Sequence, residues 1–165
     1  MATFVIPFRA NGKTRLGDQQ LARAMLADVQ AAAGDALVVD EPGGQGTAVA
    51  SALAELSGPV TIVNSDVPCV TASELETLSA AAPALVAAAD GTTNALALSS
   101  PELFAPLYGP GSARRFGALA SARLVQAPNL MDDVDTVDDL ERLVDRLGPH
   151  TSRVVAQLRV GAGMA

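Results

Sequence analysis

The sequence predicts an α/β fold, in which helices cover both faces of a mainly parallel sheet to give a three-layer α/β/α sandwich. Short apolar runs of strand length alternate with longer stretches in which apolar residues recur at helical spacing. Gly, Pro and Asp residues, which favour turns, separate these runs. The chain has 165 residues, of which 49% are hydrophobic, so we expect a single domain over residues 1–165 with one full core.

The first half of the chain alternates strand and helix. Residues 3–8 are apolar and lead into a polar loop, which is typical of a buried strand. Leu21, Met25 and Val29 recur at helical spacing, and Gly34 closes that helix. The further elements expected in this half are a strand at residues 36–39, a helix at 47–56 and a strand at 60–64.

The second half continues the same alternation. Two apolar runs separated by Asp90-Gly91-Thr92 are interpreted as strands, and Ala-rich or Leu-rich stretches as helices. The expected strands are at residues 84–88, 94–98 and 123–126, and the expected helices are at 73–81, 101–107, 112–121, 136–147 and 151–159.

Charge and composition narrow the class of partner. The net charge of −7 and the pI near 4.5 argue against a nucleic-acid groove, which needs a basic stripe. The single Cys69 fits a reducing compartment. The longest mostly apolar run, residues 80–89, is about half a membrane span, so we expect no membrane contact and a soluble, cytoplasmic protein.

The run from Asp133 to Asp139 is the most informative stretch of the chain. Asp133 and Asp135 are two residues apart in a segment expected to be extended, so their carboxylates share a face. Two such carboxylates suit a hard cation such as Mg²⁺, which commonly helps to hold phosphates. The alternative is that Asp135 or Thr136 caps the following helix and that the later acidic residues complement its positive end.

Other candidate residues fall at the carboxyl ends of predicted strands, where ligands bind in open α/β sheets. Asp66 follows the strand at residues 60–64, and the turn at residues 42–46 follows the strand at 36–39. A small anionic ligand is compatible with the acidic chain if a few basic residues and a divalent ion reverse the local potential.

Five segments together resemble the 2-phospho-L-lactate or phosphoenolpyruvate guanylyltransferase family of coenzyme F-420 biosynthesis. They are Ile6-Pro7-Phe8-Arg9 with Lys13-Thr14-Arg15-Leu16, Asn64-Ser65-Asp66-Val67-Pro68, Thr92-Thr93-Asn94-Ala95-Leu96, Tyr108-Gly109-Pro110-Gly111-Ser112 and Asp133-Val134-Asp135-Thr136. The resemblance implies a nucleotide-sugar-transferase-like fold. It also implies transfer of GMP from GTP to phosphoenolpyruvate or 2-phospho-L-lactate, with release of pyrophosphate.

The resemblance also implies a role for each matching residue. Asp66, Asp133 and Asp135 match the metal ligands, and Thr93, Gly109 and Ser112 match positions that contact the acceptor. Lys13 and Arg15 would meet the triphosphate and stabilise the departing pyrophosphate. Candidate residues for the remaining contacts are Arg114 for the acceptor carboxylate and Gly43, Gly44 and Gly46 for the nucleotide.

The chain departs from the family pattern on the side expected to hold the guanosine. About thirty residues, the size of one strand–helix unit, are missing between the first helix and the turn at residues 42–46. Phe116 stands where relatives often have His. An apolar face left by the missing unit would favour a homodimer.

Two other functions stay open at this stage. The first is an enzyme of the same fold that uses another base or acceptor, as in molybdenum-cofactor-type guanylyl transfer or sugar-phosphate activation. The second is a shortened paralogue that binds a phosphorylated acid or a metal without turnover.

Overall fold

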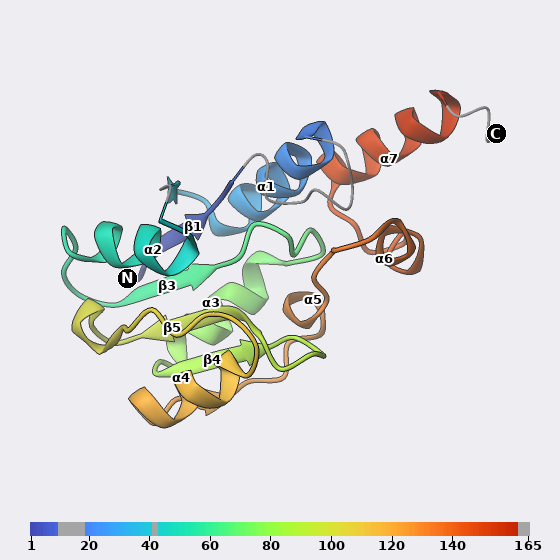
Figure 1. Ribbon diagram of the computed structural model, residues 1–165. Helices are drawn as coiled ribbons and strands as arrows, with labels where there is room; N and C mark the ends of the chain where they lie inside the picture. Colours follow the sequence, from blue (N-terminus) through green and yellow to red (C-terminus); the bar gives the residue numbers. More distant parts are fainter. Residues whose placement is uncertain (10–18, 41–42, 162–165) are drawn as a thin grey trace.

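The structure, a computed structural model, describes residues 1–9, 19–40 and 43–161 of the chain. Within these residues six strands form one sheet in the order β2-β1-β3-β5-β4-β6 (Figure 1). The strands are β1 (Thr3–Pro7), β2 (Ala36–Val39), β3 (Val60–Val63), β4 (Ala84–Ala87), β5 (Thr93–Leu98) and β6 (Arg123–Leu124). The α-helices are α1 (Gln19–Ala33), α2 (Gln45–Leu53), α3 (Ala72–Ala80), α4 (Ser112–Ala120), α5 (Pro128–Met131), α6 (Val137–Arg142) and α7 (Pro149–Gly161).

The sheet is mainly parallel, as the sequence predicts. β1 pairs in parallel with β2 and with β3, and β4 pairs in parallel with β6. Only β5 runs the other way, antiparallel to β3 and β4, and all of its residues are buried. Because β1, β2, β3 and β4 point the same way, their carboxyl ends meet at one edge of the sheet.

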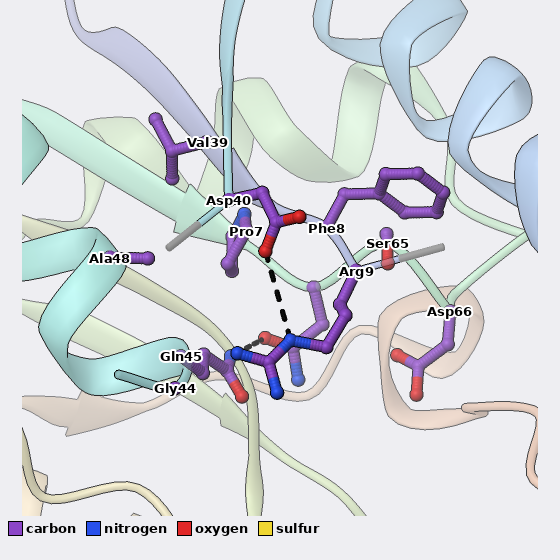
Figure 2. A pocket seen from close by; sticks show the side chains of 11 residues that line it. Pro7, Phe8, Arg9, Val39, Asp40, Gly44, Gln45, Ala48, Ser65 and Asp66 are labelled. Carbon is purple, nitrogen blue, oxygen red and sulfur yellow. Dashed lines mark hydrogen bonds and ion pairs between the residues drawn. The ribbon is translucent and has the colours of Figure 1, made fainter. Parts of the chain in front are cut away.

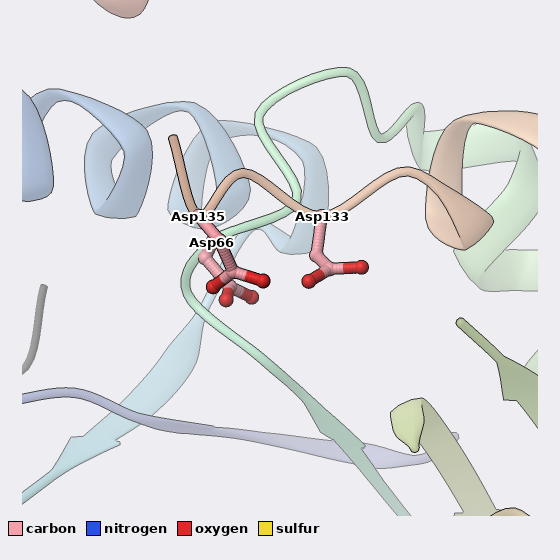
Figure 3. A group of neighbouring side chains, drawn as sticks. All are labelled: Asp66, Asp133 and Asp135. Atoms are coloured by element: carbon pink, nitrogen blue, oxygen red, sulfur yellow. The ribbon is translucent and has the colours of Figure 1, made fainter. Parts of the chain in front are cut away.

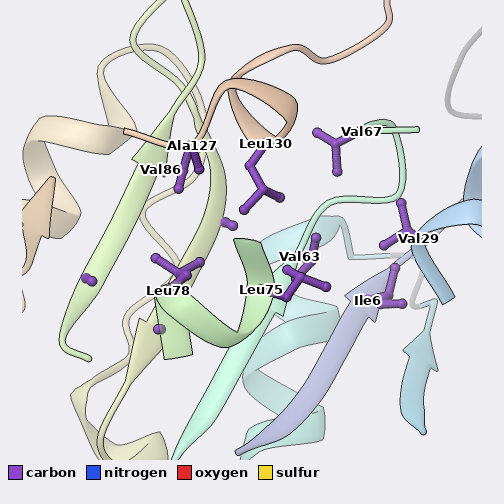
Figure 4. Packing of buried hydrophobic residues seen from close by; sticks show 12 residues of the cluster. Ile6, Val29, Val63, Val67, Leu75, Leu78, Val86, Ala127 and Leu130 are labelled. Carbon is purple, nitrogen blue, oxygen red and sulfur yellow. The ribbon is translucent and has the colours of Figure 1, made fainter. Parts of the chain in front are cut away.

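Helices cover both faces of this sheet, which confirms the predicted three layers. Figure 1 shows α2 and α4 in front of the strands and α3 behind them. On the first face Val49, Leu53 and Phe116 pack against the strands, and all are nearly or fully buried. On the second face the helices α1, α3 and α5 contribute Val29, Leu75, Leu78 and Leu130 (Figure 4).

A third apolar cluster joins α1 to the C-terminal part of the chain. Met25 of α1 packs with Leu143 and with Val155 of α7, and these side chains are buried. Figure 1 shows α7 beside α1, with its far end extending away from the sheet. Among the described helices, none has both the length and the apolar character needed to cross a membrane.

The buried Asp28 of α1 holds the start of α7. Its carboxylate accepts hydrogen bonds from the backbone N–H groups of His150 (3.0 Å) and Thr151 (2.8 Å) and from the Thr151 hydroxyl (2.6 Å). An anionic acceptor is favourable at a helix N-terminus, where N–H groups lack intrahelical partners. A Cβ on Gly148 would lie 2.3 Å from Asp28 Cγ, so Gly is required for this close approach.

We expect Asp28→Ala to lower the free energy of unfolding by about 2–4 kcal/mol, because the buried N–H and hydroxyl of Thr151 and the partly buried N–H of His150 lose their acceptor. Urea denaturation measures the loss. Asp145→Ala is the matched control, since Asp145 is exposed. Equal losses in the two variants would contradict the role assigned to Asp28.

The predicted helix at residues 101–107 is wrong beyond its first turn. A 3-10 turn at Pro101–Leu103 ends at Phe104, which is extended with φ −82° and ψ 142°. The extended path brings the rings of Phe104 and Tyr108 to 5.9 and 5.2 Å from the ring of Phe116. The contacts of Phe104 and Tyr108 with the buried ring of Phe116 outweigh the weak helical propensity of this stretch.

The C-terminal helices also differ from the prediction. The helix expected at residues 136–147 ends at Arg142, and residues 143–146 form turns. The short helix α5 was not predicted, although Pro128 stands at its first turn, where Pro is favoured.

Candidate functional site

Three aspartates converge at the carboxyl edge of the sheet. Asp66 lies just after β3, and Asp133 and Asp135 lie on the extended segment between α5 and α6. Figure 3 shows the three side chains pointing toward one another, and one carboxylate oxygen from each lies within 4.8 Å of the others. The backbone explains the approach, because Val134 N–H donates to the Asp66 carbonyl at 2.9 Å and the Val134 side chain is buried.

The segment that carries Asp133 and Asp135 is fixed at its helical end. Thr136 is the N-cap of α6, and its hydroxyl accepts from Asp139 N–H. In return the Asp139 carboxylate accepts from the N–H groups of Thr136 and Asp135 at 3.0 and 2.8 Å. The prediction that Thr136 caps the following helix is therefore correct. It does not exclude the predicted convergence of Asp133 and Asp135, because the structure shows both.

The segment is also fixed on the other side of Asp133. The Asp132 carboxylate accepts hydrogen bonds from Arg142, at 3.2 Å, and from Arg146. Asn94, buried in β5, donates through Nδ2 to the Leu130 carbonyl at 3.0 Å and to Asp133 Oδ1 at 3.3 Å. These bonds position the Asp133 carboxylate.

The electrostatics of the three aspartates favour a bound cation. Burial, followed by the neighbouring charge of Asp66, raises the pKa of Asp133 from 3.8 to about 6, against the lowering effect of the Asn94 hydrogen bond. Clustered carboxylates repel one another unless a cation lies between them. Carboxylate oxygens are the preferred ligands of hard divalent cations, so this donor set fits a metal ion.

A cavity of about 270 Å³ opens beside the aspartates, and residues from β5 and from the start of α4 line it. The Thr93 and Ser112 hydroxyls are 2.9 Å apart, and both residues are buried. The N–H groups of Ser112 and Ala113 bond to the carbonyls of Gly109 and Gly91. The lining residues are Gln45, Asn64, Asp66, Asp90, Thr92, Thr93, Asn94, Tyr108, Gly109, Ser112, Asp133 and Asp135.

This cavity carries a fourth carboxylate, on Asp90. Hydrogen bonds from the hydroxyl and the backbone N–H of Thr92 lower the pKa of Asp90, so it stays ionised at neutral pH. An anionic ligand in this cavity therefore needs a cation beside it.

A second cavity, of about 290 Å³, lies across the ends of β1, β2 and β3 (Figure 2). It is lined by Pro7, Phe8, Arg9, Val39, Asp40, Gly44, Gln45, Ala48, Asn64, Ser65 and Asp66. Gln45, Asn64 and Asp66 line both cavities. The aspartate cluster thus stands where the two cavities adjoin, so two ligands could meet there.

Hydrogen bonds connect the residues shared by the two cavities. Gln45 Nε2 donates to Asn64 Oδ1 at 2.7 Å, and Asn64 Nδ2 donates to the Thr93 carbonyl at 2.9 Å. This series of hydrogen bonds continues with the bond between the Thr93 and Ser112 hydroxyls. Gln45 and Asp40 were not singled out from the sequence, although each borders a strand end or turn at the carboxyl edge.

The structure brings some of the other predicted residues to these cavities. Gly44 lines the cavity over β1 to β3 and has φ 101°, which favours glycine. Gly43 and Arg114 are exposed and do not line either cavity. A Cβ on Gly46 would lie 2.8 Å from Pro106 Cβ, so this glycine serves close packing. Lys13 and Arg15 lie outside the described residues.

Relatives of the chain decide its family. The phosphoenolpyruvate guanylyltransferase of Streptomyces coelicolor is 36% identical over 146 residues, which cover 79% of this chain and 68% of that protein. The chain belongs to the phosphoenolpyruvate guanylyltransferase family. Proteins with the same name are 39% identical over 92 residues in Sphaerobacter thermophilus and 34% over 111 residues in Streptomyces scabiei. These two matches span 44% and 51% of the relatives' lengths.

Phosphoenolpyruvate guanylyltransferases are nucleotidyltransferases, so the chain is a member of an enzyme family, as its motifs predict. A search with family models gave no match.

Solved structures confirm the predicted type of fold. A protein of Desulfovibrio desulfuricans G20 assigned to the nucleotide-diphospho-sugar transferases superposes with a TM-score of 0.67 over 99% of both chains, at 17% identity. A homologue of Mycobacterium tuberculosis Rv0371c from Mycobacterium sp. strain JC1 superposes with a TM-score of 0.57 at 21% identity, over 95% of this chain and 98% of that one.

Proposed function

We propose that the chain transfers the guanylyl group of GTP to phosphoenolpyruvate and releases pyrophosphate, as a step in the synthesis of coenzyme F-420. The observation that carries the proposal is the position of Asp66, Asp133 and Asp135 where two adjoining cavities meet. Such a position suits a nucleoside triphosphate in one cavity and a phosphorylated acceptor in the other. The names of the relatives support phosphoenolpyruvate as the acceptor.

The reaction joins two phosphates. An oxygen of the acceptor phosphate attacks the α-phosphorus of GTP in line with the bond to the departing pyrophosphate. A new phosphoanhydride bond forms, and the bond between the α-phosphorus and the bridging oxygen of pyrophosphate breaks. A phosphate monoester has a second pKa of about 6 and is largely ionised at neutral pH, so no protein base is required.

The three aspartates would hold Mg²⁺ in this reaction. When bound, Mg²⁺ neutralises part of the charge of the triphosphate and of the developing pyrophosphate. The hydrogen bond that Asn94 donates to Asp133, and those that the Asp139 carboxylate accepts from the backbone N–H groups of the segment, keep the carboxylates in place. Positioning of this kind supplies most of the catalysis in phosphoryl-type transfer.

The remaining contacts divide between the two cavities. Thr93, Ser112 and Gly109 line the cavity proposed for the acceptor, and the hydroxyl that accepts within the Thr93–Ser112 pair can donate to the phosphate or carboxylate of the acceptor. The nucleotide would occupy the cavity that includes Gly44. Lys13 and Arg15 stay predicted contacts of the triphosphate, and Arg114 stays a predicted contact of the acceptor carboxylate.

The test is pyrophosphate release in mixtures of the protein, Mg²⁺, one of the four nucleoside triphosphates and either phosphoenolpyruvate or 2-phospho-L-lactate. We expect release with GTP and phosphoenolpyruvate, and loss of release when a chelator removes the metal. Release with another nucleotide or only with 2-phospho-L-lactate would correct the substrate. No release in any mixture, with acceptor binding retained, would indicate a binding protein.

We further propose that the chain forms a homodimer through β2, the outermost strand on one side of the described sheet. Leu37 and Val38 point to opposite faces of β2, and the two residues are 44% and 39% exposed. Exposed apolar groups on an edge strand favour association. In sedimentation, Leu37→Lys should give a monomer, while Leu124→Lys on the opposite edge strand should not change the dimer.

A further inference from the structure

We propose that Asp40 selects the base of the nucleotide, and that its carboxylate accepts hydrogen bonds from N1–H and the N2 amine of guanine. This inference rests on the proposed function, in which the donor is GTP. Asp40 directly follows β2 and lines the cavity over β1, β2 and β3 (Figure 2). Its place and its chemistry both lead to this role.

The place of Asp40 fits the far end of a nucleotide. β2 and β3 lie on either side of β1, so their ends are about 10 Å apart, which is twice the spacing of neighbouring strands. Asp66, after β3, belongs to the cluster proposed to hold the metal and the phosphates. With the triphosphate at Asp66, the ribose lies over β1 and the base reaches Asp40.

The walls of the cavity suit a flat ring. Pro7 and Ala48 are buried, Val39 is partly buried, and all three line the cavity. Gly44 adds no side chain to this wall. Apolar walls with few convergent polar groups are typical of sites for heterocyclic ligands.

The charged groups among the described lining residues are Arg9, Asp40 and Asp66. Asp66 belongs to the metal cluster, and Arg9 offers only donors. Asp40 Oδ1 lies 3.7 Å from Arg9 Nε, and the two side chains are 61% and 47% exposed. An exposed ion pair of this length is weak, so the carboxylate oxygens are accessible to a ligand.

The chemistry of the carboxylate matches guanine and opposes adenine. An ionised carboxylate has two acceptor oxygens and no donor. Guanine presents two neighbouring donors, N1–H and the N2 amine, on its Watson–Crick edge. Adenine presents an acceptor at N1, which would face the carboxylate without a proton. Xanthine keeps N1–H but carries a carbonyl in place of the N2 amine.

The test is the Asp40→Asn variant, with the kcat/KM and the equilibrium binding of GTP, ITP and XTP measured for both proteins. Asn offers one acceptor and one donor, which match N1–H and the C2 carbonyl of xanthine. We expect the preference for GTP over XTP to fall by at least about 100-fold in the variant. Asp35→Asn, at the opposite end of β2, should keep the preference of the wild type.

The outcomes separate this inference from the proposed function. If the wild-type protein turns over no nucleotide, the proposed function fails, and binding of GTP, ITP and XTP still reports on Asp40. If the wild type uses GTP and a folded Asp40→Asn variant keeps the GTP preference, or loses all nucleotides without a gain for XTP, the role of Asp40 is wrong.

A second measurement uses only the wild-type protein, so it tests the inference even if the Asp40→Asn variant does not fold. It also tests the alternative that Asp40 binds the ribose, as acidic residues do after the second strand of dinucleotide-binding folds. The wild-type protein should bind ITP, which lacks the N2 amine, at least about 10-fold more weakly than GTP. It should bind 2′-deoxy-GTP and 3′-deoxy-GTP nearly as well as GTP. Equal affinity for ITP and GTP would overturn the inference.

Discussion

Asp133→Asn is expected to reduce guanylyl transfer by at least about 100-fold while leaving the fold intact, because it removes one charge from the proposed metal site. Asn keeps the oxygen that accepts from Asn94, so the local hydrogen bond survives. Pyrophosphate release at saturating substrates measures the loss. Asp138→Asn is the matched control, since Asp138 is an exposed residue of α6. An Asp133→Asn variant that stays active and Mg²⁺-dependent would remove Asp133 from the metal site.

The same substitution should stabilise the metal-free protein. The pKa of Asp133 is raised to about 6 by burial and by Asp66, so the ionised form destabilises the folded state at neutral pH. The penalty disappears as pH falls from about 6 toward the ordinary value of 3.8, where the unfolded state is also protonated. We expect a gain of roughly 1–2 kcal/mol for Asp133→Asn at pH 7 in a chelator, and a smaller gain at pH 5.

Urea denaturation of both proteins at the two pH values measures this gain. A gain that does not depend on pH would contradict the assignment to Asp133 ionisation. Loss of activity together with gain of stability would distinguish a functional carboxylate from one that holds the fold together.

Thr93→Val is expected to raise the KM for phosphoenolpyruvate by about 10-fold or more, with little change in the KM for GTP. The substitution keeps the shape of the side chain but removes a hydroxyl from the proposed acceptor cavity and leaves Ser112 without its partner hydroxyl. Initial rates with each substrate varied in turn measure the two constants.

The chain offers a matched control for this variant. Thr61 of β3 forms a second hydroxyl pair with Ser79, at 2.7 Å, and Thr61 is fully buried and lines neither cavity. Thr61→Val should change stability by a similar amount without changing either KM. Similar KM values in both variants would show that the Thr93 hydroxyl does not contact the acceptor.

The order of strands and helices could be predicted because each element carries its own periodicity. The errors occur where long-range contacts decide the local structure. Residues 104–108 turn away from a helix because Phe104 and Tyr108 contact Phe116, which comes later in the chain. The reversed direction of β5 was not predicted, although the short connection through Asp90-Gly91-Thr92 leaves too few residues for a parallel crossover and favours an antiparallel hairpin with β4.

The three aspartates of the candidate site could be predicted from the sequence more fully than the residues around them. Asp133 and Asp135 were found from their spacing, and Asp66 from its place after a strand, and the structure brings the three together. Asp40 has a similar place after β2, but its acidic neighbour in sequence, Glu41, is adjacent and not two residues away, so the spacing that points to Asp133 and Asp135 is absent. Asn94 falls in one of the five matching segments, but its specific part, a hydrogen bond to Asp133 from within a buried strand, is shown by the structure alone.

The hydrogen bonds from Gln45 through Asn64 to Thr93 join the walls of the two cavities. A ligand that fixes Gln45 or Asn64 also fixes the carbonyl side of Thr93, so each substrate should find its own site already ordered when the other is present. Such cooperativity is reciprocal, and the factor by which GTP tightens acceptor binding must equal the factor by which the acceptor tightens GTP binding.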